Sequence, residues 1–458
     1  MAESNFSLQK TLTMLLDEKK YHSLRDILST MNPADIAAIF DDLDQARLPL
    51  LFRLLPKELA AETFVEMEPE AQELLIQGFS DSELKEVIDE LYVDDAVDIV
   101  EEMPANVVQR ILTQAEPDMR KQINEILRYP EDSAGSIMTT EYVSLRPNMT
   151  VEEAILRIRR TGIDKETIYT CYVTRGHKLI GLTSVKDLLL CEDDDATIES
   201  IMQEHVITVG TLDDKEQVAQ MFSKYNFLAL PVVDTENRLV GIVTFDDAMD
   251  VMEDEATEDM EKMAAMLPSE HPYMRSTPVE IWKNRIPWLL VLMVSATFTG
   301  LILNTYEARL SAISPVLFAC VPMMMDTGGN AGSQASVTVI RSLALNELKT
   351  SDVLKVVWKE FRASILLGLT LGAACFAKLM LIDNLLFGFE GYTPLRCGVV
   401  ASALVLTVIV AKLVGCTLPL LAKKCRLDPA VVASPFITTI VDAISLIIYC
   451  NLSVLILA

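Results

Sequence analysis

The chain has 458 residues, of which 50% are hydrophobic, and a formal net charge of −27. Residues 276–458 contain 14 lysines and arginines against 10 acidic residues, a net charge of +4, which leaves −31 for residues 1–275. An acidic part of this size repels phosphates, which excludes nucleic acid as a natural partner. The eight cysteines form no CxxC pair, which favours reduced thiols over a disulfide framework.

Residues 1–130 are predicted to be an acidic, all-helical domain. Helix-starting signals recur at NPADI, LPKEL, SDSEL, VDDAV and EPDMR, and the expected helix ends follow one another by 24 or 12 residues. No basic-then-apolar leader precedes them, so we expect the N-terminus to be cytoplasmic. This pattern is typical of a helical superhelix. It contains no catalytic constellation, and we expect no enzyme activity.

Residues 131–249 contain an internal duplication. AGSIMTTEYV resembles IESIMQEHVI, and GLTSVKDLL resembles GIVTFDDAM, so that Gly181 corresponds to Gly241. Each copy predicts the order β-α-β-β-α. The pairs Ser184–Asp187 and Thr244–Asp247 have the spacing of helix caps. The duplication resembles a tandem pair of CBS domains, an α/β module that binds adenine nucleotides or metal in some proteins and only dimerises in others.

Residues 250–275 are predicted to form an acidic linker, whose helix begins near Asp246 and ends near Met266. Acidic side chains recur three or four residues apart along it, at Asp247, Asp250, Asp254, Glu258 and Glu261. Like charges at this spacing destabilise a helix unless a cation neutralises them. The stripe is therefore either a solvated face or a binding surface for divalent cations. Asp94, Asp98 and Glu101 form a second, shorter acidic stripe.

Residues 276–458 are predicted to form a transmembrane domain of five helices. Long segments with at most one charge cover 286–306, 310–340, 363–382, 397–422 and 429–458. Basic residues gather on the flanks that face the cytoplasm if the N-terminus is inside, which places the C-terminus outside. We expect Lys378 to reach the membrane surface from its helix end. The role of Lys412, deeper in its span, is left open.

Two acidic residues within these spans, Asp326 and Asp442, indicate a cation path. A carboxylate at bilayer depth usually faces a cavity or an ion path, although it can also be protonated or hydrogen-bonded to a neighbouring helix. Gly328, Gly329 and Gly332 predict irregular backbone beside Asn330, with close helix packing as the alternative. All four histidines lie outside the spans, and oxygen ligands favour Mg²⁺, Ca²⁺ or Mn²⁺ over zinc or copper.

The segments VPMMMDTGGNAGSQ and DPAVVASPFITTIVD, together with the acidic helices, the CBS pair and the linker, resemble the MgtE magnesium channel/transporter family. The resemblance implies a homodimer with a pore between its subunits, lined by Asp442 as the main Mg²⁺ ligand, with Asn330 beside it. Family members often have glycine where this chain has Asp326, so the part that Asp326 plays as a ligand stays open.

The resemblance also gives the linker a function, as a plug helix below the cytoplasmic mouth of the pore. Cytosolic Mg²⁺ is then expected to hold the plug against the other cytoplasmic domains and close the pore. The implied regulatory ligands are Asp247, Asp250, Glu255, Glu258 and Asp259 on the plug, Glu62, Asp94 and Asp98 in the helical domain, Asp214 and Glu216 in the second CBS copy, and Asp428 before the last span. ATP is an additional expected ligand of the CBS pair.

The sequence thus predicts a multidomain α-helical membrane protein that takes up Mg²⁺ passively across the plasma or inner membrane. No GxxxxGK[ST] motif is present, so a primary pump is not indicated. A CBS-regulated anion channel, a membrane-anchored sensor without transport, and a channel that also conducts Mn²⁺ or Ca²⁺ are the alternatives.

Overall fold

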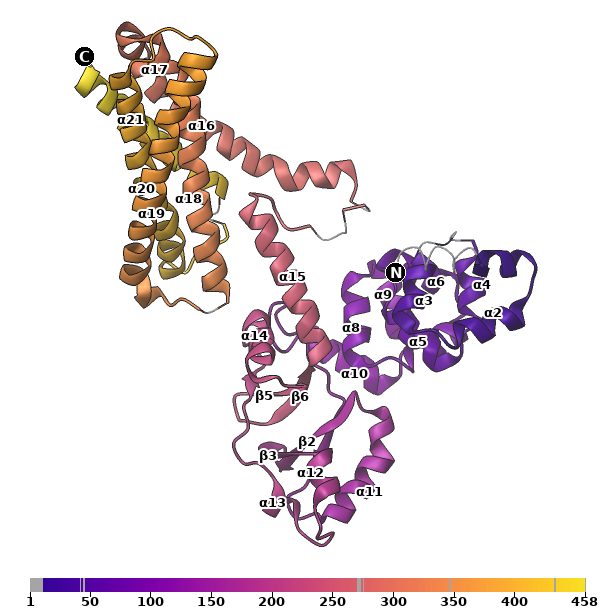
Figure 1. Ribbon diagram of the computed structural model, residues 1–458. Helices are drawn as coiled ribbons and strands as arrows, with labels where there is room; N and C mark the ends of the chain where they lie inside the picture. The colour runs from indigo at the N-terminus through magenta and orange to yellow at the C-terminus, as the bar shows by residue number, and fades with distance from the viewer. Residues whose placement is uncertain are drawn as a thin grey trace. The chain divides into compact units, whose positions relative to one another are not determined.

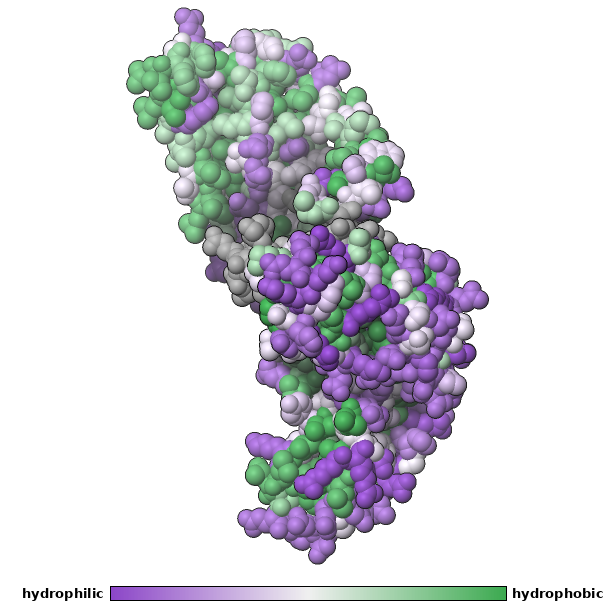
Figure 2. Space-filling model, turned by 90° about the vertical axis from the view of Figure 1, so that its right-hand side faces the viewer, coloured by the Kyte–Doolittle hydropathy of each residue, from purple (hydrophilic) through white to green (hydrophobic). Residues whose placement is uncertain are grey.

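The computed structural model describes residues 11–41, 43, 46–269, 273–274, 276–345, 347–431 and 434–457. The chain divides into two compact units, Met1–Met252 and Glu253–Ala458. Polar side chains cover most of the first unit, whereas apolar side chains dominate the surface of the second (Figure 2). Each unit is described by itself.

The first unit begins with a run of short helices, as the sequence predicts. Their bounds are α2 (Tyr21–Leu28), α3 (Pro33–Asp41), α4 (Leu48–Phe52), α5 (Lys57–Val65), α6 (Pro69–Gly78), α7 (Asp81–Ile88), α8 (Val93–Glu102), α9 (Ala105–Gln114) and α10 (Pro117–Ile126). All five predicted start signals begin a helix. Proline in the first turn of α4, α6 and α10 fits a position that needs no backbone N–H donor.

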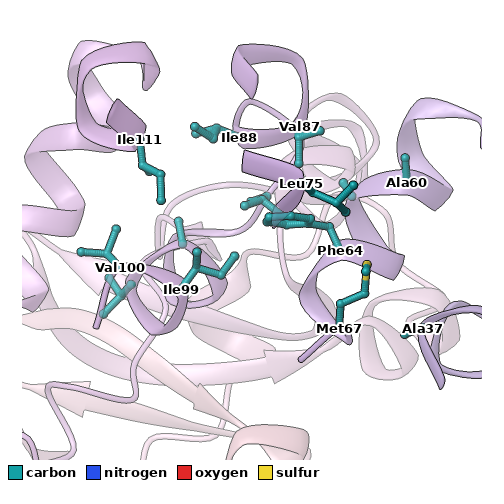
Figure 3. Close-up of a cluster of buried hydrophobic side chains, with 14 of the residues drawn as sticks. Ala37, Ala60, Phe64, Met67, Leu75, Val87, Ile88, Ile99, Val100 and Ile111 are labelled. Atoms are coloured by element: carbon teal, nitrogen blue, oxygen red, sulfur yellow. The ribbon is translucent and has the colours of Figure 1, made fainter. Parts of the chain in front are cut away.

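These helices stack as a superhelix because each packs mainly on the helix two places along the chain. Contacts join α3 to α5, α5 to α7, α7 to α9 and α8 to α10. Phe64, Leu75 and Ile99 are among the side chains that fill the space between them (Figure 3). Each short helix buries too little apolar surface to be stable alone, so the array depends on its neighbours.

The rest of the first unit is the predicted duplication, with the β-α-β-β-α order in each copy. The first copy contains β1 (Tyr142–Leu145), α11 (Val151–Thr161), β2 (Thr167–Arg175), β3 (Lys178–Ser184) and α12 (Val185–Leu190). The second contains α13 (Ile198–Ile201), β4 (Val209–Gly210), α14 (Lys215–Tyr225), β5 (Ala229–Val233), β6 (Leu239–Thr244) and the start of α15 (Phe245–Met263). In both sheets the first two strands are parallel and the last two antiparallel.

The two copies exchange equivalent contacts, which explains the paired motifs in the sequence. A Cβ at Gly181 would lie 2.6 Å from Sδ of Met202, and one at Gly241 would lie 2.7 Å from Sδ of Met138. Each Ile-Met segment therefore packs against the glycine of the other copy. Only glycine leaves room for this approach.

The second unit contains the apolar helices. They are α16 (Pro278–Ile313), α17 (Pro315–Ala319), α18 (Val321–Ala344), α19 (Val353–Ala377), a π-helical turn (Lys378–Leu386), α20 (Pro394–Lys424) and α21 (Ser434–Leu457). Helices α18 to α21 run side by side as a bundle, and α16 packs on α21 (Figure 1). Among the described residues, four helices are long and apolar enough to cross a membrane: α16, α19 with its π-helical turn, α20 and α21.

Helix α18 corrects one expectation about the second predicted span. The backbone around Gly328, Gly329 and Gly332 is regular helix rather than irregular, because packing on both sides supports it. These glycines instead allow the helices to pack closely, which was the alternative expectation. A Cβ at Gly328 would lie 2.6 Å from Oγ of Ser445, and one at Gly415 on α20 would overlap the carbonyl oxygen of Gly332.

Lys378, which is expected to reach the membrane surface, also has an ion-pair partner that the sequence did not predict. Its Nζ lies 2.6 Å from Oδ2 of Asp383, whose side chain is only 8% exposed. The two residues are five apart within the π-helical turn, so that the wider turn places them together. A buried carboxylate needs a partner, and Lys378 supplies it while its own side chain stays 46% exposed.

The glycine contact between α18 and α20 predicts a stability difference within one helix. Replacing Gly415 by alanine should destabilise the second unit by about 1–3 kcal/mol, because the added methyl group overlaps the α18 backbone. Gly398→Ala on the same helix is the matched control, since no heavy atom of the described residues lies within 4 Å of its added Cβ. Thermal unfolding of the purified protein in detergent measures both, and equal midpoints would contradict the proposed contact.

Candidate functional site

Asp326 and Asn330 on α18 lie together with Asp442 on α21. Nδ2 of Asn330 donates a hydrogen bond of 3.1 Å to Oδ1 of Asp326. A Cβ at Gly329 would lie 3.4 Å from Oδ1 of Asp442, so the Asp442 carboxylate rests against the α18 backbone. Asp326 is close enough to interact electrostatically with Asp442. Two carboxylates and an amide oxygen thus form one oxygen-rich group between α18 and α21.

This group belongs to a polar stripe, defined as Asp326, Asn330, Gln334 and Thr338, which recurs every four residues along α18. All four side chains are exposed in the single chain. At membrane depth, lipid cannot hydrate or hydrogen-bond such groups. The stripe therefore needs either water or a protein surface against it.

A second acidic group lies within the first unit, where α8 meets the CBS pair and the start of α15. We call it the α8–α15 acid cluster and define it as Asp94, Asp95, Asp98, Glu141, Glu166, Asp246 and Asp247. The N–H of Val93 donates to Oε2 of Glu141 at 3.2 Å, which ties α8 to the first CBS copy. Within the described part of the chain, Oδ1 of Asp94 and Oε2 of Glu166 are buried and accept no hydrogen bond.

Burial and mutual repulsion raise the pKa values of this cluster. Burial is the largest cause in each case, and neighbouring carboxylates add to it. The pKa of Asp95 is raised to about 7, that of Asp98 to about 8 and that of Glu166 to about 9. The pKa values of Asp94 and Asp247, which repel each other, are raised as well. Such a cluster favours binding of protons or cations, since either relieves the repulsion.

In the first unit, the structure brings only some of the predicted site residues together. Asp94, Asp98 and Asp247 belong to the α8–α15 acid cluster, and Oδ2 of Asp247 also accepts a 2.5 Å hydrogen bond from Oγ1 of Thr244 as a helix cap. Asp214 caps α14 by accepting from the N–H groups of Glu216 and Gln217. Oε1 of Glu216 accepts from Gln220. Glu62 on α5 and Asp250 on α15 are exposed and lie outside the cluster as defined.

Sequence reasoning missed Asp95, Glu141 and Glu166. Asp95 adjoins Asp94, so an acidic pair at the start of α8 was a detectable signal. Glu141 and Glu166 carry no local signal. They come together because β1 and β2 are parallel neighbours, with the N–H of Glu166 bonded to the carbonyl of Glu141 at 3.0 Å.

In the second unit, a lysine joins the end of α15 to the segment before α21. Nζ of Lys262 lies 2.8 Å from Oε1 of Glu258 and 2.9 Å from Oδ2 of Asp428. Burial and repulsion by Asp428 raise the pKa of Asp259 beside this bridge. Glu255 is half-buried one turn earlier. Lys262 was not predicted, and it occupies the position between two acids that a cation would otherwise neutralise.

Among the described residues, no three histidine, cysteine or acidic side chains converge tightly enough to ligate one ion directly. The buried, unpaired oxygens of Asp94 and Glu166 are acceptors to which the waters of a hydrated cation donate hydrogen bonds.

Three family profiles match the chain. Residues 321–452 match MgtE, a divalent cation transporter; residues 31–132 match the MgtE intracellular N domain; and residues 134–192 and 198–254 match CBS domains. Together they cover the helical array, the duplication and most of the apolar helices.

Relatives of known function are similar over nearly the whole length. The magnesium transporter MgtE of Thermus thermophilus is 38% identical over 455 residues, covering 98% of both chains. The magnesium transporter MgtE of Bacillus subtilis is 31% identical, covering 96% of this chain and 95% of the relative. The crystal structure of the cytosolic domain of the Mg²⁺ channel MgtE in complex with ATP has a TM-score of 0.51, is 38% identical, and covers 53% of this chain and 99% of that one.

The raised pKa values predict how pH affects the first unit without divalent cations. Acids whose pKa is raised on folding stabilise the folded state while protonated, and this contribution is lost as pH rises through their folded pKa values. The unfolding midpoint of the full protein in EDTA should therefore fall by several degrees between about pH 6 and pH 9. Mg²⁺ should reduce that fall, and so should Asp98→Asn combined with Asp247→Asn. A midpoint that rises over this range would contradict the prediction.

Proposed function

The chain belongs to the MgtE family of magnesium transporters, and on this premise we propose that it is a passive Mg²⁺ channel closed by cytosolic Mg²⁺. Transport of Mg²⁺, membrane location with an intracellular N-terminal domain and the lack of an enzyme role follow from family membership. The channel mechanism, the residues that carry it and its regulation are proposals. The observation that carries them is the oxygen-rich group of Asp326, Asn330 and Asp442.

The polar stripe supports a pore between two subunits. Its side chains are exposed on a single chain, and burial against a second copy would remove them from lipid. A homodimer with α18 and α21 at its centre would surround the path with the carboxylates of Asp442 from both copies.

The membrane potential is sufficient to drive entry through such a path. An inside-negative potential favours inward movement by about 2.3 kcal/mol per charge per 100 mV, and a divalent ion gains twice this amount. Asp442 on each subunit would offset part of the cost of partly dehydrating the ion. Crossing of α16, α18, α19, α20 and α21 in alternating directions would leave the C-terminus outside.

The acidic groups of both units support regulation by the transported ion. Bare carboxylates in the α8–α15 acid cluster repel one another, which favours separation of α8 from α15 at low Mg²⁺. Bound Mg²⁺ cancels the repulsion and selects the compact form. At the end of α15, Asp259 and Glu258 face Asp428, so the same ion would act on the segment that leads into α21. We assign Asp250, Glu255, Glu62, Asp214 and Glu216 to this regulatory set by resemblance only.

Ion selectivity and nucleotide binding also belong to this proposal. The matching family profile describes divalent cation transport, so Mn²⁺ and Ca²⁺ are the competing substrates to compare with Mg²⁺. The cytosolic domain of a similar channel was crystallised with ATP, and we propose that the CBS pair of this chain binds an adenine nucleotide as a regulatory ligand.

Replacing the pore carboxylate tests the channel directly. Asp442→Ala should abolish Mg²⁺ influx into liposomes with low internal Mg²⁺, because the ion loses the negative group that offsets its dehydration. Glu307→Ala, an exposed acid at the far part of α16, is the control and should keep wild-type influx. Normal influx in the Asp442 variant would remove this residue from the pore. No influx in the wild type would favour the sensor instead.

Neutralising acids on α15 tests the gate separately from the pore. The double variant Asp247→Asn with Glu258→Gln should conduct at high cytosolic Mg²⁺, where the wild type closes, because the ion can no longer link α15 to its neighbours. Influx should be measured as a function of Mg²⁺ on the cytoplasmic face, with Glu253→Gln, an exposed α15 acid outside the regulatory set, as the control. Inhibition that persists unchanged in the double variant would refute gating through α15.

A further inference from the structure

The interior of the membrane unit holds one more charged pair, which the pore described above does not use. Lys412 on α20 is 8% exposed, and its Nζ lies 3.8 Å from Oε2 of Glu360 on α19. Within the described part of the chain, Oε2 of Glu360 is buried and accepts no hydrogen bond. Lys412 lies within the predicted span 397–422, where an ionised group is costly and seldom without a function, and Glu360 lies just before the span 363–382.

Close packing encloses this pair along both helices. Val356, one turn before Glu360, and Cys416, one turn after Lys412, belong to the same apolar cluster, which also contains Ala335 and Val339 of α18. In the other direction, a Cβ at Gly368 would lie 3.2 Å from the carbonyl oxygen of Val405 on α20. Water is therefore poorly placed to screen either charge, and each depends on the other for neutralisation.

The pair also lies at the depth of the pore carboxylate. A Cβ at Gly332 on α18 would lie 3.3 Å from the carbonyl oxygen of Ala411 and 3.1 Å from Cγ2 of Val441. Gly332 thus touches the residue before Lys412 on one side and the residue before Asp442 on the other. If Lys412 were left unpaired, its positive charge would oppose a cation bound at Asp442.

We propose that Glu360 is a positioning residue for conduction, which holds Lys412 against α19 and neutralises it so that the lysine does not repel the divalent cation at Asp442. This inference rests on the proposed channel function. The two charges then have unequal importance. Loss of Glu360 leaves an uncompensated positive charge beside the path, whereas loss of Lys412 leaves a carboxylate, which does not oppose cation binding.

The test compares Mg²⁺ influx into liposomes for wild type, Glu360→Gln, Lys412→Met, the combined variant, and the exchanged pair Glu360→Lys with Lys412→Glu. Glu360→Gln should lose about tenfold or more of the influx, and the combined variant should recover to within about twofold of wild type. Lys412→Met alone should keep most of the influx. Gel filtration and thermal unfolding of each variant report how much protein is folded, and influx is compared per folded protein.

Several outcomes would overturn the inference. Equal losses in Glu360→Gln and Lys412→Met would indicate a purely structural pair, and wild-type influx in Glu360→Gln would show that the lysine does not act on the path. If Glu360→Gln does not fold, the combined variant decides the question. Influx in the combined variant as low as in Asp442→Ala would then overturn the inference. Absence of influx in the wild type contradicts the channel itself, whereas normal wild-type influx with an unaffected Glu360→Gln contradicts only this inference.

Discussion

A carboxylate removed from water needs a positive charge nearby, and this electrostatic requirement governs both units of the protein. At three places in the second unit, away from Asp326 and Asp442, the chain supplies the positive charge itself. Lys378 pairs with Asp383, Lys262 bridges Glu258 and Asp428, and Lys412 faces Glu360. In the α8–α15 acid cluster, by contrast, the carboxylates act mainly on one another. A bound cation can therefore stabilise the α8–α15 acid cluster more than it stabilises the acids that already pair with a lysine.

We propose that this distribution of charge links ion concentration to conformation. The population of a compact form whose acids repel one another would then depend on protons and divalent cations. Lys262 gives the end of α15 a different character, because its ammonium already bridges two acids to which Mg²⁺ would otherwise bind. The two ends of α15 are therefore expected to respond to Mg²⁺ with different sensitivity.

In the membrane unit, small residues decide where the polar groups point. Gly332 and Gly415 bring α18 and α20 into backbone contact, and Gly328 leaves room for the side chains of Ser445 and Val441 on α21. With these faces buried, the polar stripe is left on the remaining face of α18. The glycines thus do more than tolerate close packing, since they orient Asp326 and Asn330 toward the place where a second subunit or water must lie.

The sequence by itself determined the elements whose signals are local. The helix starts of residues 31–130, the two β-α-β-β-α copies and the acidic helix beginning at Phe245 follow from capping residues, period and repetition, and the structure has all of them. The unusual residues Asp326, Asn330 and Asp442 were also evident, because oxygen-bearing side chains are rare in apolar spans.

Only the tertiary structure decided which distant residues meet. Glu141 and Glu166 join Asp94 through a parallel strand pair, Lys378 finds Asp383 through a π-helical turn, and Lys412 finds Glu360 on another helix. The glycines of α18 were expected to break the helix, yet the packing of α20 and α21 keeps it regular. Local propensity is worth about 1 kcal/mol per glycine, whereas the burial and charge pairing that override it depend on contacts between residues far apart in the chain.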